Sequence, residues 1–140
     1  MSTTTPTLRL KKNEERRLLA GHLWIYSNEV DTSATPLNTF EPGQLVAIHS
    51  SRDQFIAMAY VNPRSLICAR VYSHRNEQPL DRELLAARIQ TALEWREQCF
   101  GEQSYRLVHG EGDWLPGLIV DRFGDHLVVQ ANTVGMYQAL

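Results

Sequence analysis

The stretch GEGDWLPGLIVDRFG, which starts at Gly110, contains the carboxylates whose spacing comes closest to a catalytic pattern. On an extended backbone, His109, Glu111 and Asp113 would point the same way, because side chains along a strand alternate with a period of two. Such a trio could hold a divalent ion or supply an acid and a base, as in a small metal-dependent hydrolase. However, Gly110 and Gly112 lie between them, and glycine favours turns. We therefore expect a turn whose acidic side chains accept its own backbone N–H groups, and no metal site.

Other signatures of a self-contained catalytic site do not occur in the sequence. It has no Gly-x-Gly-x-x-Gly loop that opens a helix, no Gly-x-Ser-x-Gly elbow, and no Cys–His pair at a suggestive position. Cys68 and Cys99 stand far apart and match no metal-binding spacing, so we expect them to be reduced cytosolic thiols. Catalysis by this chain alone is therefore not predicted.

A basic and aromatic set of side chains lies in the first half of the chain, where Trp24, Tyr26 and Tyr72 accompany the cations. Phosphate contacts and stacking aromatics are what RNA binding requires. Taken singly, each Arg is more typical of a solvated surface, and Trp24 is more typical of a core. Taken together, they favour RNA binding. The predicted RNA-binding residues are Lys11, Lys12, Arg16, Arg17, His22, Arg52, Arg64 and Arg70.

Short β segments should position this set. Lys11 to Ala20 is rich in helix formers and Gly21 follows as a stop signal, so a helix is predicted there. Residues 22–30 have the aromatic and β-branched content of a strand, and three further strands separated by turn residues are expected over 44–49, 54–61 and 65–73. Both alternating faces of residues 55–61 are apolar, which predicts a small barrel with further structure packed on its outside.

The second half begins with a composition shift near residues 74–79. Leu80 to Phe100 is the clearest helix, with Asp81 as its N-cap and apolar residues at helical spacing: Leu85, Ile89, Ala92, Leu93 and Cys99. An extended segment over 105–109 and a hairpin over 118–122 and 126–130 should follow. The last residues have the pattern of a helix that is only beginning, and we expect the natural chain to continue past Leu140.

Charge also divides the chain. Residues 1–76 contain nine Lys and Arg against six Asp and Glu, whereas residues 77–140 contain five against ten. Basic and acidic halves suggest two modules with different partners. No run of eighteen apolar residues and no secretory leader is visible, so we expect a cytoplasmic protein that does not enter a membrane.

Three stretches resemble bacterial 23S ribosomal RNA methyltransferases that act on cytosine C5. LKKNEERRLLAGHLWIYSNEV resembles the family's entry segment, although Leu23 stands where the family has Pro. YVNPRSLICARVYS is similar to a strand pair of the family. YRLVHGEGDWLPGLIVDRFGDHLVVQ matches a long and specific family signature almost without gaps. The motif residues carried over with no known role are Glu111, Asp113, Pro116, Gly117 and Asp121.

The resemblance implies an α+β fold with two parts. Residues 1–73 would be a PUA-like pseudo-barrel that binds ribosomal RNA, and residues 74–140 the start of an α+β linker domain. In the family a Rossmann-like domain follows, which binds S-adenosylmethionine (SAM) and carries the catalytic cysteines. Neither Cys68 nor Cys99 matches that nucleophile motif, so no catalytic residue is assigned and the chain alone is expected to be inactive. The alternative is a stand-alone, non-enzymatic PUA-type RNA-binding protein.

Overall fold

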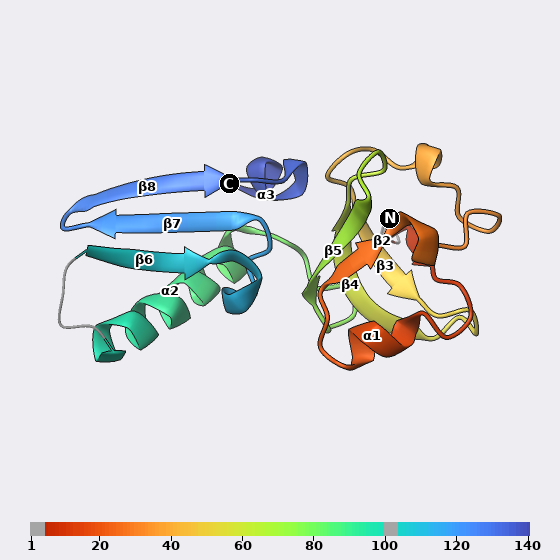
Figure 1. Ribbon diagram of the computed structural model, residues 1–140, viewed down its shortest axis with the longest axis horizontal. Helices are drawn as coiled ribbons and strands as arrows, with labels where there is room; N and C mark the ends of the chain where they lie inside the picture. The colour runs from red at the N-terminus through yellow and green to blue at the C-terminus, as the bar shows by residue number, and fades with distance from the viewer. Residues whose placement is uncertain (1–4, 100–103) are drawn as a thin grey trace. The chain divides into compact units, whose positions relative to one another are not determined.

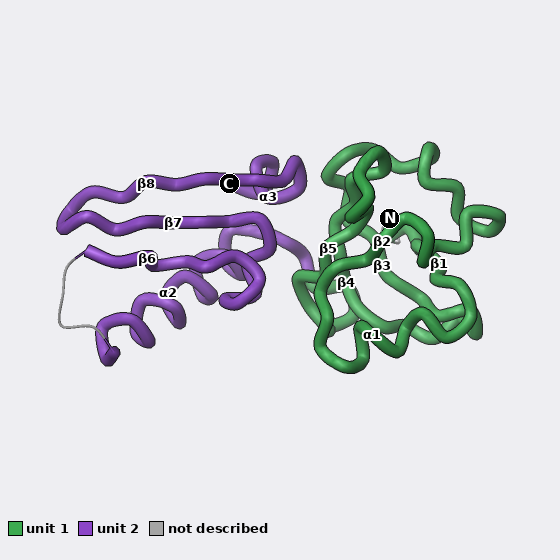
Figure 2. The backbone as a smooth tube through the Cα atoms, in the orientation of Figure 1, with its two compact units in different colours: residues 1–78 green, residues 79–140 purple. Residues whose placement is uncertain are grey.

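The computed structural model describes residues 5–99 and 104–140 (Figure 1). The chain divides into two compact units, residues 1–78 and residues 79–140 (Figure 2). The assignment of residues 1–73 and 74–140 as functional domains stays a prediction. Each unit combines helices with an antiparallel or mixed sheet, so the predicted α+β class is confirmed.

The first unit is a curled five-stranded sheet in the order β1-β3-β4-β5-β2. Its strands are β1 (Thr7–Arg9), β2 (Trp24–Tyr26), β3 (Leu45–His49), β4 (Phe55–Val61) and β5 (Ile67–Ser73). The β1–β3 pair is parallel and the other pairs are antiparallel. The chain segments that follow the two edge strands, β1 and β2, pair with each other. Leu10 forms an isolated β-bridge with Val30, and the Lys11 N–H donates to the Glu29 carbonyl at 2.9 Å. These contacts close the sheet into a pseudo-barrel.

The centre of the barrel is apolar, as the sequence of β4 predicts. Leu8, Val46, Ala57 and Val71 are fully buried and belong to one hydrophobic cluster. Every residue of β4 after Phe55 is buried, so both faces of this strand are covered. The predicted doubly apolar strand is therefore confirmed.

Helix α1 (Glu15–Leu19) is shorter than the predicted helix over residues 11–20. The barrel closure holds the backbone at Leu10 and Lys11 extended, and Asn13 then takes a left-handed conformation with φ 70°. Because a left-handed residue interrupts a right-handed helix, the first helical turn begins only after it. Two 3₁₀ helices, η1 (Ser27–Glu29) and η2 (Leu37–Thr39), complete the unit.

The second unit is an antiparallel sheet in the order β6-β7-β8 with a helix alongside β6 (Figure 1). Its elements are α2 (Arg82–Cys99), β6 (Ser104–His109), η3 (Gly110–Asp113), β7 (Leu118–Phe123), β8 (His126–Ala131) and α3 (Val134–Ala139). The predicted N-cap of α2 is confirmed, since Asp81 Oδ1 accepts the Leu84 N–H at 3.0 Å. Phe100, the last residue of the predicted helix, lies outside the described residues.

The core of the second unit lies between α2 and the sheet, where Leu85, Ala92, Leu107 and Leu118 meet. Cys99, which has helical spacing with the apolar face, is exposed, so its predicted place in that face is wrong. Strand β8 is exposed along nearly its whole length. Within the described residues, no helix is both long enough and apolar enough to span a bilayer.

Candidate nucleic-acid interface

The end of α1 sets the direction of the chain toward β2. Gly21 follows the helix with φ 108°, and its N–H donates to the Leu18 carbonyl at 3.1 Å. The His22 N–H donates to the Arg17 carbonyl, also at 3.1 Å. Together these bonds form a Schellman motif, which requires a left-handed residue and therefore favours glycine. The predicted stop at Gly21 is confirmed, and it delivers His22 and Trp24 to the surface.

Trp24 on β2, which is exposed, and Arg70 on β5, which is half-buried, form a cation–π pair. They are directly opposite in the antiparallel register, and the Arg70 guanidinium lies 5.2 Å from the Trp24 ring centroid. Trp24 is 37% exposed, so the expectation that it belongs to the core is wrong. Tyr72, one of the aromatic residues that accompany the cations of the predicted RNA-binding set, is fully buried. A cation held against an indole at the surface offers charge for a phosphate and a flat face for a base.

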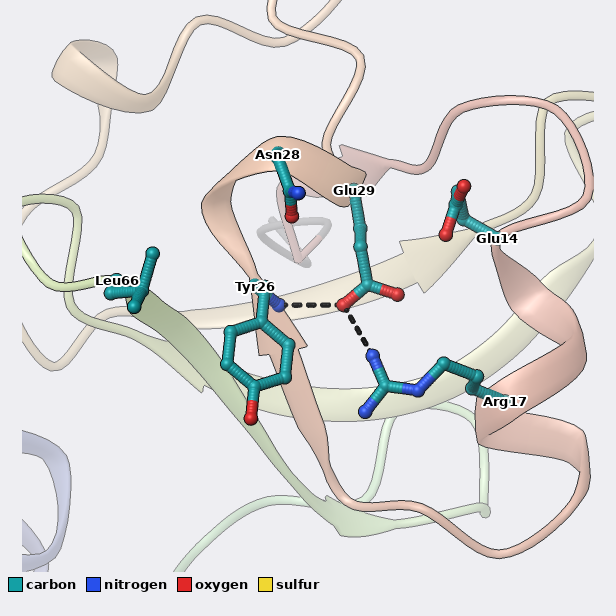
Figure 3. A pocket seen from close by; sticks show the side chains of 6 residues that line it. All are labelled: Glu14, Arg17, Tyr26, Asn28, Glu29 and Leu66. Carbon is teal, nitrogen blue, oxygen red and sulfur yellow. Dashed lines mark hydrogen bonds and ion pairs between the residues drawn. The ribbon is translucent and has the colours of Figure 1, made fainter.

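A second Arg–aromatic pair lines a neighbouring pocket of about 410 Å³ (Figure 3). Arg17 from α1 lies 5.2 Å from the Tyr26 ring centroid and donates to Glu29 Oε1 at 2.9 Å. The same oxygen accepts the Tyr26 N–H at 2.8 Å. Glu14, Asn28 and Leu66 complete the lining.

The ion pair in this pocket restricts what Arg17 can do. Its charge is balanced by Glu29, which is only 7% exposed, and a carboxylate so close disfavours a phosphate. Arg17 therefore fastens α1 to η1 and holds the Tyr26 ring. In contrast with Arg17, the side chains of Lys11, Lys12 and Arg16 are exposed and make no ion pair among the described residues.

The structure brings only part of the predicted set together. Lys11, Lys12, Arg16, Arg17 and His22 belong to one continuous segment around α1, which leads into the Trp24–Arg70 pair. Lys11, Lys12, Arg16 and His22 are exposed residues of this segment, and together with Trp24 and Arg70 we call them the α1–β2 face. Arg52 lies in the β3–β4 turn and Arg64 in the β4–β5 turn, which are at opposite ends of β4.

The acidic motif of the second unit is built into the fold. Residues 110–113 form η3, so the extended backbone that would align the three candidate ligands is not present. Asp113 accepts the His109 N–H at 2.7 Å and two hydrogen bonds from Arg96 Nη2, at 3.0 and 3.2 Å. Because Arg96 is on α2, Asp113 joins that helix to the turn. Among the residues described, no three His, Cys, Asp or Glu side chains gather in a way that could hold a metal ion.

The remaining motif residues also have local partners. Asp121 on β7 accepts a hydrogen bond from Arg106 on β6 at 2.8 Å, and this bond holds the pKa of the Asp121 carboxyl below its usual value. Pro116 is buried, and Gly117 has φ 82°. A Cβ on Gly117 would lie 2.5 Å from Thr133 Oγ1, so only glycine fits between β7 and the start of α3.

Sequence reasoning missed Glu29, Asn28 and Leu66 as pocket residues. Their positions depend on η1 and on the β4–β5 turn, which are brought together by the Ser27 N–H bond to the Leu66 carbonyl at 2.9 Å. The sequence motif SNEV contains no periodicity that marks a buried carboxylate. An acidic residue three positions after an N-cap is a known capping pattern, and Glu29 does bond back to Tyr26 in this way.

Comparison with known proteins agrees with this geometry. Residues 8–74 match the family model of a PUA-like domain. The ribosomal RNA large subunit methyltransferase I of Salmonella arizonae is 35% identical over 133 residues, which are 93% of this chain and 32% of that protein. The enzyme of the same name from Cronobacter sakazakii is 36% identical over 129 residues, or 90% and 32%. The chain therefore spans about a third of the length of the curated relatives it matches.

Solved structures support the same fold. A structure described as a SAM-dependent methyltransferase from Streptococcus mutans superposes with a TM-score of 0.78 at 20% identity, covering 95% of this chain and 34% of that one. A methyltransferase solved in complex with S-adenosylhomocysteine (SAH) gives a TM-score of 0.79 at 20% identity and the same coverage. The pseudo-barrel and its closure agree with the match of residues 8–74 to a PUA-like domain.

Proposed function

We propose that this chain is the RNA-binding part of a SAM-dependent methyltransferase that modifies large-subunit ribosomal RNA at cytosine C5. The observation that carries the proposal is the similarity to ribosomal RNA large subunit methyltransferase I over nine-tenths of the chain. The resemblance of the Tyr105–Gln130 signature supports the cytosine-C5 assignment. A ribosomal RNA partner implies a cytoplasmic protein.

The α1–β2 face is the part of the chain best suited to RNA. It combines the exposed Lys11, Lys12 and Arg16 with the Trp24–Arg70 pair, in a unit with more Lys and Arg than Asp and Glu. Lys and Arg contacts to phosphates fix the register of an RNA, while unpaired bases stack on aromatic rings. We infer that this face holds the RNA so that the target base reaches a catalytic domain elsewhere in the full-length protein.

The residues described here do not fit a SAM site. The second unit has an antiparallel sheet, whereas nucleotide-type cofactors bind at the carboxyl ends of parallel strands in doubly wound folds. Cys68 is buried and its thiol donates to the Ile25 carbonyl at 3.5 Å. We therefore assign no step of methyl transfer to this chain, and we expect the chain alone to be inactive.

RNA affinity of the 140-residue chain tests the binding part of the proposal. Filter binding to a large-subunit rRNA transcript should weaken about 50- to 100-fold between 50 and 300 mM salt if three phosphates are contacted. Trp24→Ala should weaken binding about 5- to 100-fold because a stacking surface is lost, and Trp24→Phe should restore most of it. Arg82→Ala, an exposed cation on α2, is the matched control. Affinity that is insensitive to salt and to Trp24 would refute the proposal.

The methyltransferase part is tested on the full-length protein encoded by the natural gene. Reading the gene beyond codon 140 should reveal a further domain, and the purified protein with labelled SAM should form 5-methylcytosine in large-subunit rRNA. Label on another nucleotide would retain the methyltransferase assignment and refute the cytosine-C5 assignment. A stop codon after Leu140 would leave a stand-alone RNA-binding protein.

A further inference from the structure

A cavity of about 550 Å³ lies in the first unit at the end of the barrel that carries the β4–β5 turn. It falls in the size range of small-ligand pockets. Two chain segments line it: Leu37 to Pro42, which includes η2, and the turn residues Pro63 and Arg64. Leu37, Phe40 and the two prolines supply apolar surface, while Asn38, Glu41 and Arg64 supply the polar groups.

Packing against the barrel core and backbone hydrogen bonds hold the segments that line this cavity in place. Leu37 and Phe40 pack against the hydrophobic cluster of the barrel. The Phe40 N–H donates to the Leu37 carbonyl at 3.2 Å, and the Gly43 N–H donates to the Val61 carbonyl at 2.6 Å. On the other side, the Ser65 N–H donates to the Asn62 carbonyl at 3.1 Å. A preformed pocket binds more tightly because little ordering entropy is lost on binding.

Arg64 gives the cavity its charge. Its side chain is exposed and has no ion-pair or hydrogen-bond partner among the residues described. A guanidinium is well suited to phosphate because it can donate two parallel hydrogen bonds. Glu41 also lines the cavity, and its carboxylate repels phosphate. A phosphate should therefore bind nearer to Arg64 than to Glu41.

We propose that this cavity takes one unpaired RNA nucleotide, with its base against the apolar wall at Phe40 and its phosphate at Arg64. An apolar wall, one amide and one cation match a nucleotide, which has a flat face, a polar edge and an anionic group. Asn38 provides an amide that can both donate to and accept from a base edge. The inference deepens the proposed RNA binding and rests on it, but it concerns a surface separate from the α1–β2 face.

Mononucleotides probe the cavity directly. In ¹⁵N-labelled 140-residue chain, UMP and AMP should shift the backbone amides of Asn38, Phe40 and Arg64, whereas sodium phosphate alone should shift chiefly Arg64. Uridine without phosphate should bind more weakly than UMP. Equal shifts with sodium phosphate and with UMP would show that the cavity binds only an anion, and would overturn the proposal. The absence of any shift would overturn it as well.

Affinity for RNA then separates this site from the α1–β2 face. With an eight-nucleotide single-stranded RNA of mixed sequence, Arg64→Ala and Phe40→Leu should each weaken binding about 5- to 50-fold. Glu41→Gln should strengthen it a few-fold. Phe40→Leu keeps apolar packing, and circular dichroism verifies its fold. Arg82→Ala is the charge-matched control, and a twelve-base-pair RNA duplex should be bound equally by all variants. Salt-dependent rRNA binding that is unchanged in both cavity variants would overturn this inference and leave the proposed function standing.

Discussion

The two cysteines show how position in the fold sets the reactivity of a side chain. Cys68 on β5 is fully buried, and loss of hydration raises the pKa of its thiol to about 11. The thiolate is the reactive form, and with this raised pKa the Cys68 thiol stays almost entirely protonated at pH 7.5. Cys99, at the end of α2, is exposed. Cys68 is therefore a structural residue.

We predict that Ellman's reagent modifies one thiol rapidly in the native chain at pH 7.5 and the second only on unfolding. The fast phase should disappear in Cys99→Ser, and guanidinium should make both thiols of the wild type react together. Because the thiolate is the reactive form and its fraction in the unfolded chain rises with pH, the slow phase should accelerate toward pH 9. Two equally fast thiols in the native chain would contradict the burial of Cys68.

At the level of elements, the pattern of apolar residues predicted the strands and the main helix well. β3, β4, β5, β6, the β7–β8 hairpin and α2 all lie where periodicity and turn residues placed them. Each depends mainly on local sequence, because strands bounded by turn residues and a capped helix are encoded within a few residues. The turn preference of the glycines around Glu111 was likewise confirmed as η3.

Elements and site residues fixed by distant contacts were not predictable in this way. The late start of α1 follows from the Leu10–Val30 bridge, which joins residues twenty positions apart. The surface position of Trp24 follows from the edge location of β2 in the sheet, although its local sequence is apolar. The pocket around Glu29 requires η1 and the β4–β5 turn to meet. Tertiary contacts of this kind override local propensity.

Gly117 illustrates a constraint between elements that can be tested with a matched pair. Both Gly117 and Gly124 have positive φ, at 82° and 62°, but only a Cβ on Gly117 would collide with Thr133. We predict that Gly124→Ala lowers the free energy of unfolding of the second unit by about 1 kcal/mol through backbone strain alone. Gly117→Ala should lower it by more than about 2 kcal/mol because the side-chain clash adds to that strain.

Urea denaturation followed by far-ultraviolet circular dichroism measures both variants. A double variant, Gly117→Ala with Thr133→Ala, should recover part of the lost stability because the colliding side chain becomes smaller. Equal effects of the two single substitutions would show that the close approach of Thr133 to Gly117 does not matter for stability.

At the scale of the whole molecule, each unit has a hydrophobic core of its own and a different charge balance. Leu8 and Leu115 are both fully buried, the first in the barrel cluster and the second in the cluster of the second unit. The excess of Lys and Arg lies in the first half of the chain and the excess of Asp and Glu in the second. Stability and RNA affinity should therefore be separable between the units.

We predict that calorimetry resolves two unfolding transitions, because separate cores need not unfold together. Leu8→Ala and Leu115→Ala each remove a buried leucine side chain at a cost of about 2–5 kcal/mol. Each should lower the midpoint temperature of one transition by about 10 °C or more and leave that of the other transition unchanged. A ligand stabilises only the unit that binds it. Saturating RNA should therefore raise the midpoint temperature of the transition that Leu8→Ala lowers. If RNA instead raises the transition sensitive to Leu115→Ala, the second unit carries the RNA site, and the α1–β2 face loses its proposed role.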